Sequence, residues 1–249
     1  ETYLHHTYIF MFGFCPVCFS SKAALNATTM ASVRGGDTGG GGKSGVSILI
    51  VGAGRLGTWL AVKFAKNQKE AGGEMREENA KVFLKGSGRR KRVGGDKTRD
   101  IVAKLVEEHE ISHIESYEDE RFQKVMREKK KGKEEFRFDY VFVTVKTYAF
   151  DKVVEEMTRA NIPTPKIAVM LHNGIVEPIF KGLGDGYVPC VIPQSYDFVD
   201  ASDGKGGRFT IKVKNEEKPW AMPNTDEAKR VHALLTSIGA NSQPDEDFE

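Results

Sequence analysis

The sequence predicts an α/β protein built on a doubly wound, mostly parallel sheet, and three observations lead to this prediction. Short apolar runs rich in β-branched residues, typical of buried parallel strands, alternate along the chain with segments of helical periodicity. A glycine-rich turn joins the first of these runs to the first helical segment. Polar residues directly follow later runs, at the place where open α/β sheets bind ligands. Together these features indicate strands and helices alternating around one sheet.

Residues 1–45 are expected to precede the fold as a disordered leader or linker. Residues 23–47 are rich in Gly, Ser, Thr and Ala, a composition typical of flexible segments. Acidic residues are nearly absent before Asp37, so an organellar targeting peptide is one interpretation. The other is a translated leader ahead of Met30. We therefore expect a cytoplasmic location, with an organellar location as the alternative.

Two motif-like strings in this leader are incomplete. Cys15 and Cys18 form a CxxC, but no second pair or suitably spaced His completes a zinc site. The string from Asp37 to Ser44 resembles a P-loop, but it begins with Asp where Gly is required, and no strand precedes it. We expect neither string to bind a ligand, and we expect no metal.

The elements of the predicted domain follow from residue 46 onward. Predicted strands cover residues 47–51, 81–85, 138–145, 166–171, 188–192 and 208–214. Predicted helices cover residues 58–69, 98–109, 150–159 and 226–238. The strand at 208–214 alternates apolar and polar residues, which predicts one solvated face. Residues 118–135 mix both charge signs in near balance, which predicts a solvated helical insertion rather than a nucleic-acid surface.

Composition limits the classes of partner. The formal net charge is +2, with 39% hydrophobic and 29% charged residues, which fits a soluble protein. No apolar run reaches the roughly 18 to 20 residues that a membrane span needs. Three cysteines in 249 residues do not form a disulfide framework, which favours a reducing compartment. We therefore expect neither a membrane nor a nucleic acid as partner.

The glycine-rich turn matches the pattern GxGxxG between a strand and a helix. In such turns the first glycine permits a tight bend, the second admits a pyrophosphate, and the third allows close packing of helix on strand. The helix N-terminus also offers free amides to the phosphates. This context predicts a Rossmann-type dinucleotide-binding domain. The candidate phosphate-binding residues are Gly52, Ala53, Gly54, Arg55, Leu56 and Gly57.

The end of the second predicted strand favours NADP over NAD. NAD sites usually place an acid there for the ribose 2′-hydroxyl, but this strand ends at Lys85 and runs into a basic loop. Arg suits a 2′-phosphate because its planar fork binds two oxygens. We therefore predict that Lys85, Arg89 and Arg90 contact the cofactor, the alternative being an ordinary solvated basic loop.

Two further residues follow predicted strands. Lys146 ends the strongest strand in the sequence Thr-Val-Lys, and Asn173 follows the next strand in the sequence His-Asn-Gly. Both positions face the crevice beyond the carboxyl ends of the strands. The order of GxGxxG, Thr-Val-Lys and His-Asn-Gly over residues 46–239 resembles the ketopantoate reductase (2-dehydropantoate 2-reductase) family.

This resemblance implies that NADPH delivers hydride to the ketone carbon of ketopantoate, giving pantoate for pantothenate and coenzyme A synthesis. It also implies that Lys146 and Asn173 act as catalytic residues beside the nicotinamide ribose and the substrate, and contact the cofactor. The family has a second, all-helical domain that supplies the general-acid Lys. Here the sequence stops at Glu249, about where that domain would begin.

We therefore expect residues 46–240 to form the cofactor domain and residues 241–249 to be a stub that leads toward the helical domain. Two alternatives remain: a non-catalytic NADP(H)-binding module, and a reductase of another 2-oxo acid. Apolar surface left exposed by a missing domain leaves a homodimer as one option.

Overall fold

The computed structural model describes residues 46–70, 82–86, 97–130, 136–172, 186–201 and 208–248. All of them belong to the structural unit Gly42–Glu249. The predicted leader at residues 1–45 lies outside the described residues. So do three of the predicted cofactor contacts, namely Arg89, Arg90 and Asn173.

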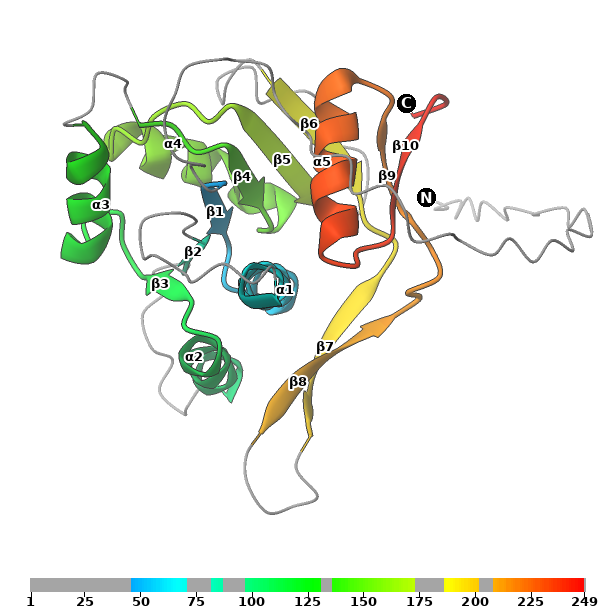
Figure 1. The fold of residues 1–249 in the computed structure, drawn as a ribbon, viewed down its shortest axis with the longest axis horizontal. Helices are drawn as coiled ribbons and strands as arrows, with labels where there is room; N and C mark the ends of the chain where they lie inside the picture. Colours follow the sequence, from blue (N-terminus) through cyan, green and yellow to red (C-terminus); the bar gives the residue numbers. More distant parts are fainter. Residues whose placement is uncertain are drawn as a thin grey trace, which may run out of the picture. The chain divides into compact units, whose positions relative to one another are not determined.

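An eight-stranded sheet forms the centre of the fold, in the order β10-β9-β6-β5-β4-β1-β2-β3 (Figure 1). All neighbouring strands pair in parallel, except for the antiparallel pair β6–β9. This confirms the predicted doubly wound, mostly parallel α/β fold. The strands are β1 (Ile48–Val51), β2 (Val82–Lys85), β3 (Ser112–Ile114), β4 (Tyr140–Val143), β5 (Ile167–His172), β6 (Gly186–Val191), β9 (Trp220–Pro223) and β10 (Ser242–Asp245).

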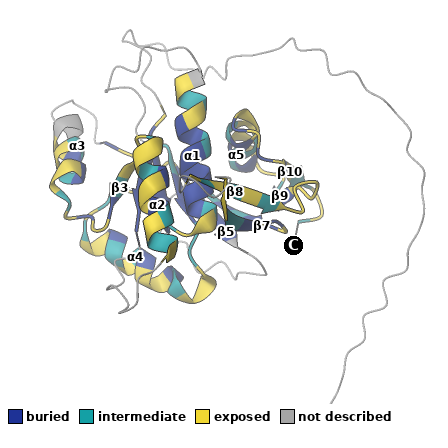
Figure 2. Ribbon diagram, turned by 90° about the horizontal axis from the view of Figure 1, so that it is seen from below, coloured by how far each residue is buried: buried dark blue, intermediate teal, exposed yellow. Residues whose placement is uncertain are grey.

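Helices cover both faces of this sheet (Figures 1 and 2). They are α1 (Arg55–Glu70), α2 (Lys97–Glu108), α3 (Glu120–Lys130), η1 (Thr147–Ala149), α4 (Phe150–Arg159) and α5 (Asp226–Ser237). Helices α1, α2 and α5 contribute to one apolar cluster, and α3 and α4 contribute to another. Strand β1 divides its side chains between the two clusters, with Ile48 and Ile50 in the first and Leu49 and Val51 in the second. Because both faces are covered, every residue of β1 is buried, as its continuous apolar run predicts.

Aromatic side chains fill the second cluster. Phe83 of β2 meets Phe122 of α3 edge to face, with ring centroids 5.3 Å apart, and Phe138 stacks on Phe122 at 6.2 Å. Full burial of one such ring stabilises the fold by roughly 1.5–3 kcal/mol. Helix α3 was predicted as a solvated insertion. It is helical, but the prediction was wrong about its surroundings, because Phe122 and Met126 are buried in the core.

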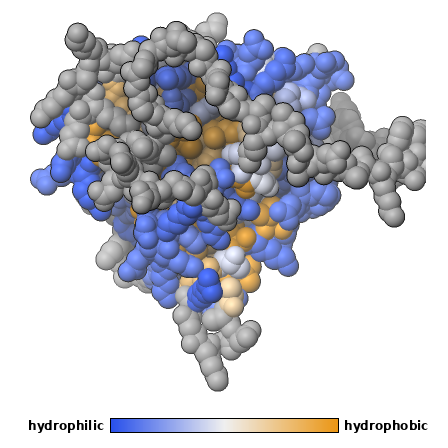
Figure 3. Space-filling model, viewed as in Figure 1, coloured by the Kyte–Doolittle hydropathy of each residue, from blue (hydrophilic) through white to orange (hydrophobic). Residues whose placement is uncertain are grey.

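Two strands, β7 (Ser195–Asp200) and β8 (Phe209–Lys214), form a separate antiparallel hairpin. The alternation predicted for residues 208–214 is confirmed in β8, whose residues are intermediate and exposed in turn. The intermediate ones pack against the core cluster of α1 and α2. Figure 3 shows apolar atoms along this hairpin, bordered by hydrophilic ones.

A buried amide holds the base of the hairpin. The Oε1 atom of Gln194 accepts hydrogen bonds from the hydroxyl of Tyr196 at 2.8 Å and from Nε1 of Trp220 at 2.9 Å. Its Nε2 atom donates to the backbone carbonyl of Lys218 at 2.8 Å. These bonds join the start of β7 to β9.

In the part of the chain that the structure describes, no helix is both long and apolar enough to cross a membrane.

Candidate dinucleotide-binding site

The glycine-rich turn joins β1 to α1 at the carboxyl edge of the sheet. Gly52 has φ +116°, and a Cβ on it would lie 2.6 Å from Oγ1 of Thr144. Its amide donates to the carbonyl of Lys85 at 2.9 Å. Glycine is therefore required at this position twice over, by its backbone conformation and by the side chain that it faces.

The other two glycines of the motif have opposite surroundings. A Cβ on Gly57 would lie 1.9 Å from the carbonyl oxygen of Gly52, so α1 can start this close to β1 only with glycine there. A Cβ on Gly54 would meet no described atom within 4 Å. The second glycine thus faces open space at the N-terminus of α1, where unpaired amides bind anions. These residues fit a dinucleotide pyrophosphate.

Thr144 fastens this turn to the neighbouring strand. Its amide donates to the carbonyl of Val51 at 2.9 Å, and its Oγ1 lies 2.9 Å from the carbonyl oxygen of Gly52. The hydroxyl therefore fixes the first bend of the turn from β4. No role was predicted for Thr144, although it begins the Thr-Val-Lys sequence at the end of the strongest predicted strand.

The remaining turn residues divide between core and surface. Ala53 and Leu56 pack against the core cluster beneath the turn. Arg55 is exposed, and its guanidinium lies 3.3 Å from Oδ1 of Asp197 in β7. Lys214 also pairs with Asp197, at 2.7 Å, and these cations, chiefly Lys214, lower the pKa of Asp197. The side chain of Arg55 is thereby directed toward the hairpin.

Lys146 lies at the same edge of the sheet as the turn, because β4 pairs with β1 up to Val143 opposite Val51. It is exposed, and its carbonyl accepts a hydrogen bond from the amide of Ala149 at 2.8 Å, which closes η1. Tyr148 in η1 is 78% exposed. The structure therefore brings Lys146 and the glycine turn to one edge, as the sequence predicts.

Lys85 has a different environment from the one expected of a surface cofactor contact. Its side chain is buried, and Nζ donates to the carbonyl of Gly86 at 2.7 Å and lies 3.7 Å from Oε2 of Glu156 in α4. The ammonium also lies 5.1 Å from the ring centroid of Tyr117. Burial lowers the pKa of Lys85, and Glu156 partly offsets this effect. The ammonium is thus held between β2 and α4.

Side chains from β3, from the residue after it and from α2 come to the end of β2, which has no acid of its own there. A Cβ on Gly86 would lie 3.0 Å from Oε2 of Glu115 and 3.3 Å from Nε2 of His113. Arg99 of α2 pairs with Glu115 at 2.8 Å. No local motif identifies these residues, because only the pairing of β2 with β3 brings them to Gly86.

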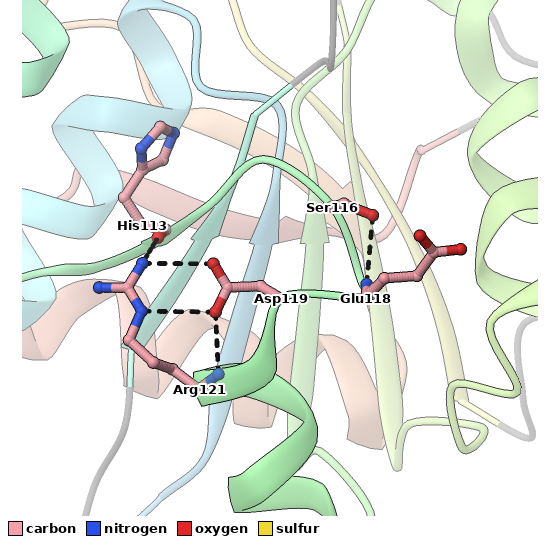
Figure 4. A network of polar contacts seen from close by, with 5 residues as sticks. All are labelled: His113, Ser116, Glu118, Asp119 and Arg121. Atoms are coloured by element: carbon pink, nitrogen blue, oxygen red, sulfur yellow. Dashed lines mark hydrogen bonds and ion pairs between the residues drawn. The ribbon is translucent and has the colours of Figure 1, made fainter.

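Arg121 fixes the loop that carries Glu115 (Figure 4). Its guanidinium donates to Oδ2 of Asp119 at 3.2 Å and to the carbonyl of His113 at 3.4 Å, while the amide of Glu118 donates to Ser116 at 3.1 Å. The ring of His113 points away from this network (Figure 4). Among the described residues, no group of three His, Cys, Asp or Glu side chains could hold a metal ion.

Comparison with solved structures finds several that are similar to this chain. A protein from Enterococcus faecalis assigned as a 2-dehydropantoate 2-reductase matches with a TM-score of 0.50 and 12% identity, over 81% of this chain and 57% of that one. The 2-dehydropantoate 2-reductase of Porphyromonas gingivalis matches with a TM-score of 0.47 and 15% identity, over 82% and 66%. A D-mandelate dehydrogenase in complex with NADH and anilino(oxo)acetate matches with a TM-score of 0.47 and 15% identity, over 81% and 57%. This chain thus spans 57% to 66% of the length of these structures.

Comparison with curated protein sequences gives no match. The sequence model of a protein family described as "Ketopantoate reductase PanE/ApbA" matches residues 48–180, which is more than half of the 249 residues. The matched segment begins at β1 and includes the glycine turn and Lys146, so the motifs that carry the resemblance lie within it. The chain belongs to the ketopantoate reductase family.

Proposed function

We propose that this chain supplies the NADPH-binding domain for the reduction of ketopantoate to pantoate, on the route to pantothenate and coenzyme A. The observation that carries the proposal is the glycine turn, in which Gly52 and Gly57 are enclosed and Gly54 faces open space. Bound NADPH would supply the hydride. The residues of this chain would bind and orient the reactants.

The turn would hold the pyrophosphate. The amides of the first turn of α1 have no partners within the helix, so they are available to phosphate oxygens. Arg89 and Arg90 remain our predicted contacts for the 2′-phosphate.

Lys146 would act at the nicotinamide end of the site. It is exposed at the carboxyl edge of β4, beside β1. An ammonium there attracts the carboxylate of a 2-oxo acid and can donate a hydrogen bond to its ketone oxygen, which gains negative charge during reduction. Asn173 is the second predicted catalytic residue at this end.

A second candidate is a module that binds NADP(H) without turnover. It would need only the glycine turn and the contacts to the 2′-phosphate, and not Lys146 or Asn173 as catalytic residues. A reductase of another 2-oxo acid would use the same cofactor contacts. The substrate assay distinguishes these candidates.

The test is a titration of the full 249-residue chain with NADPH, followed by ketopantoate in the same sample. We expect saturable binding that Gly54→Val abolishes, because a side chain there would crowd the pyrophosphate. The variant should keep its fold, since a Cβ on Gly54 meets nothing within 4 Å. Absence of NADPH binding in the unmodified chain would overturn the proposal.

The absorbance of the reduced nicotinamide then separates the candidates. Oxidation of NADPH on addition of ketopantoate supports the reductase. Binding without oxidation by ketopantoate or by a panel of other 2-oxo acids supports the binding module.

A further inference from the structure

The end of β2 carries a set of side chains that come from other elements. The amide of Gly86 donates to the carbonyl of Ile114 at 2.8 Å, so β2 and β3 run side by side up to Gly86 and Glu115. Oε2 of Glu115 and Nε2 of His113 lie 3.0 and 3.3 Å from the position of a Cβ on Gly86. A carboxylate and an imidazole therefore meet at this glycine.

Arg99 completes the set from α2. Its guanidinium lies 2.8 Å from Oε1 of Glu115, and the two side chains are 41% and 48% exposed. A pair this exposed can exchange partners at small cost, because water and a ligand compete with it. Nε2 of His113 is buried and has no hydrogen-bond partner among the residues that the structure describes.

In dinucleotide-binding domains, residues at the end of the second strand recognise the group on the 2′-position of the adenosine ribose. An acid there binds the 2′-hydroxyl of NAD, and an arginine accommodates the 2′-phosphate of NADP. Lys85 is the residue of β2 itself at this place, but its ammonium is held by Gly86 and Glu156 on the α4 side of the sheet.

We propose that Arg99 and Glu115 select between the two cofactors at this position, Arg99 by binding the 2′-phosphate of NADPH and Glu115 by binding the 2′-hydroxyl of NADH. The assignment rests on the proposed function as a nicotinamide-dinucleotide-binding domain, and it adds Glu115, which directly follows β3, and Arg99 of α2 to that site. Binding of NADPH exchanges the Glu115 carboxylate for the 2′-phosphate as the partner of Arg99. The carboxylate left beside the phosphate opposes this exchange, so Glu115 limits the preference for NADPH.

The test compares the dissociation constants of NADPH and NADH for the full chain, Arg99→Ala and Glu115→Gln. Arg99→Ala should weaken NADPH roughly tenfold, as expected for one charge-assisted hydrogen bond, and leave NADH within about twofold. Glu115→Gln should weaken NADH several-fold and should not weaken NADPH, so the two variants move the ratio in opposite directions.

Arg208→Ala is the matched control. It breaks another solvent-exposed Arg–Glu pair, with Glu108 at the other end of α2, where the guanidinium lies 3.4 Å from the carboxylate and the two side chains are 75% and 38% exposed. This control should leave the ratio unchanged. Competition by adenosine 2′,5′-bisphosphate and by adenosine 5′-monophosphate isolates the 2′-phosphate, and only the former should be weakened by Arg99→Ala.

Three outcomes overturn the inference. If the unmodified chain binds NADPH and the ratio stays the same in Arg99→Ala and Glu115→Gln, other residues read the 2′-position. If Arg89→Ala or Arg90→Ala alone abolishes the preference while Arg99→Ala is neutral, the basic loop carries it. If the unmodified chain binds neither nucleotide, the proposed function fails as well, which distinguishes that failure from the first two.

Discussion

Each glycine of the glycine-rich turn between β1 and α1 is needed for a different physical reason. Gly52 adopts a positive φ, and Gly57 allows α1 to approach the carbonyl of Gly52. Gly54 leaves open space at the N-terminus of α1. The first two requirements concern folding, and the third matters only for the proposed ligand. Substitutions should therefore separate stability from binding.

Gly57→Ala should lower the free energy of unfolding by about 1–3 kcal/mol or more, because the Cβ of the alanine would overlap the carbonyl oxygen of Gly52. Gly54→Ala should leave that free energy nearly unchanged and weaken NADPH binding instead. Urea denaturation and NADPH titration measure the two effects. Equal stability of the two variants would contradict the geometry of the turn.

Lys85 is a buried cation whose charge costs stability. Its folded pKa lies below the unfolded value of 10.5, so the unfolded chain binds more protons and stability rises with pH across that interval. Lys85→Met removes this desolvation cost together with the bonds to Gly86 and Glu156. At pH 7 it should therefore lose less stability than the roughly 3–5 kcal/mol that breaking a buried ion pair usually costs. The unmodified chain should gain stability relative to Lys85→Met as the pH rises toward 10.5, because Lys85 then loses its proton in the folded state first.

Urea denaturation of both proteins at several pH values measures this difference in the free energy of unfolding. Lys85→Ala serves as the control, because it removes the charge and also leaves a cavity. A Lys85→Met effect that is large, destabilising and independent of pH would show that the bonds to Gly86 and Glu156 outweigh desolvation.

At the scale of elements, one buried amide links the hairpin β7–β8 to β9. Gln194 joins it to β9 through Tyr196 and Trp220, all three of which are buried. Because these groups lie away from water, each lost bond leaves an unsatisfied donor. Arg55 then links the same hairpin to the phosphate turn through Asp197.

Gln194→Leu should destabilise the fold by roughly 2–5 kcal/mol, because it leaves the Tyr196 hydroxyl and the Trp220 indole N–H buried without an acceptor. Tyr196→Phe removes one of those donors together with its bond and should cost only about 1 kcal/mol. Urea denaturation monitored by tryptophan fluorescence measures both. The network has no such role if Gln194→Leu is the milder change.

At the scale of the whole molecule, covering both sheet faces makes the interior inaccessible to reagents. Cys190 of β6 is fully buried beside β5, and burial raises the pKa of its thiol. A thiol reacts as its thiolate, so Cys190 should be inert in the folded state. Its reactivity therefore reports opening of the sheet.

Modification of Cys190 by a chromogenic disulfide should proceed no faster than unfolding and should accelerate with denaturant. A Cys15→Ser/Cys18→Ser variant isolates the signal of this thiol. Rapid labelling at a rate independent of denaturant would mean that β6 is exposed by local motion.

The sequence by itself determined the inner strands, the phosphate turn and the place of Lys146. Buried parallel strands are continuous apolar runs, and the turn is defined by local backbone geometry, so both are visible within a few residues. Strands β3, β7, β9 and β10 have no such pattern, and β10 extends the sheet past residue 240, where we expected the domain to end.

Only the tertiary structure placed Glu115 and Arg99 at the end of β2, and only it directed Lys85 inward toward α4. It also showed that α3 is part of the core, since a few buried aromatic residues outweigh its many charges. The physical reason is the same in each case. These contacts join residues far apart in the sequence, and which side chains meet depends on strand pairing and helix packing that no local pattern encodes.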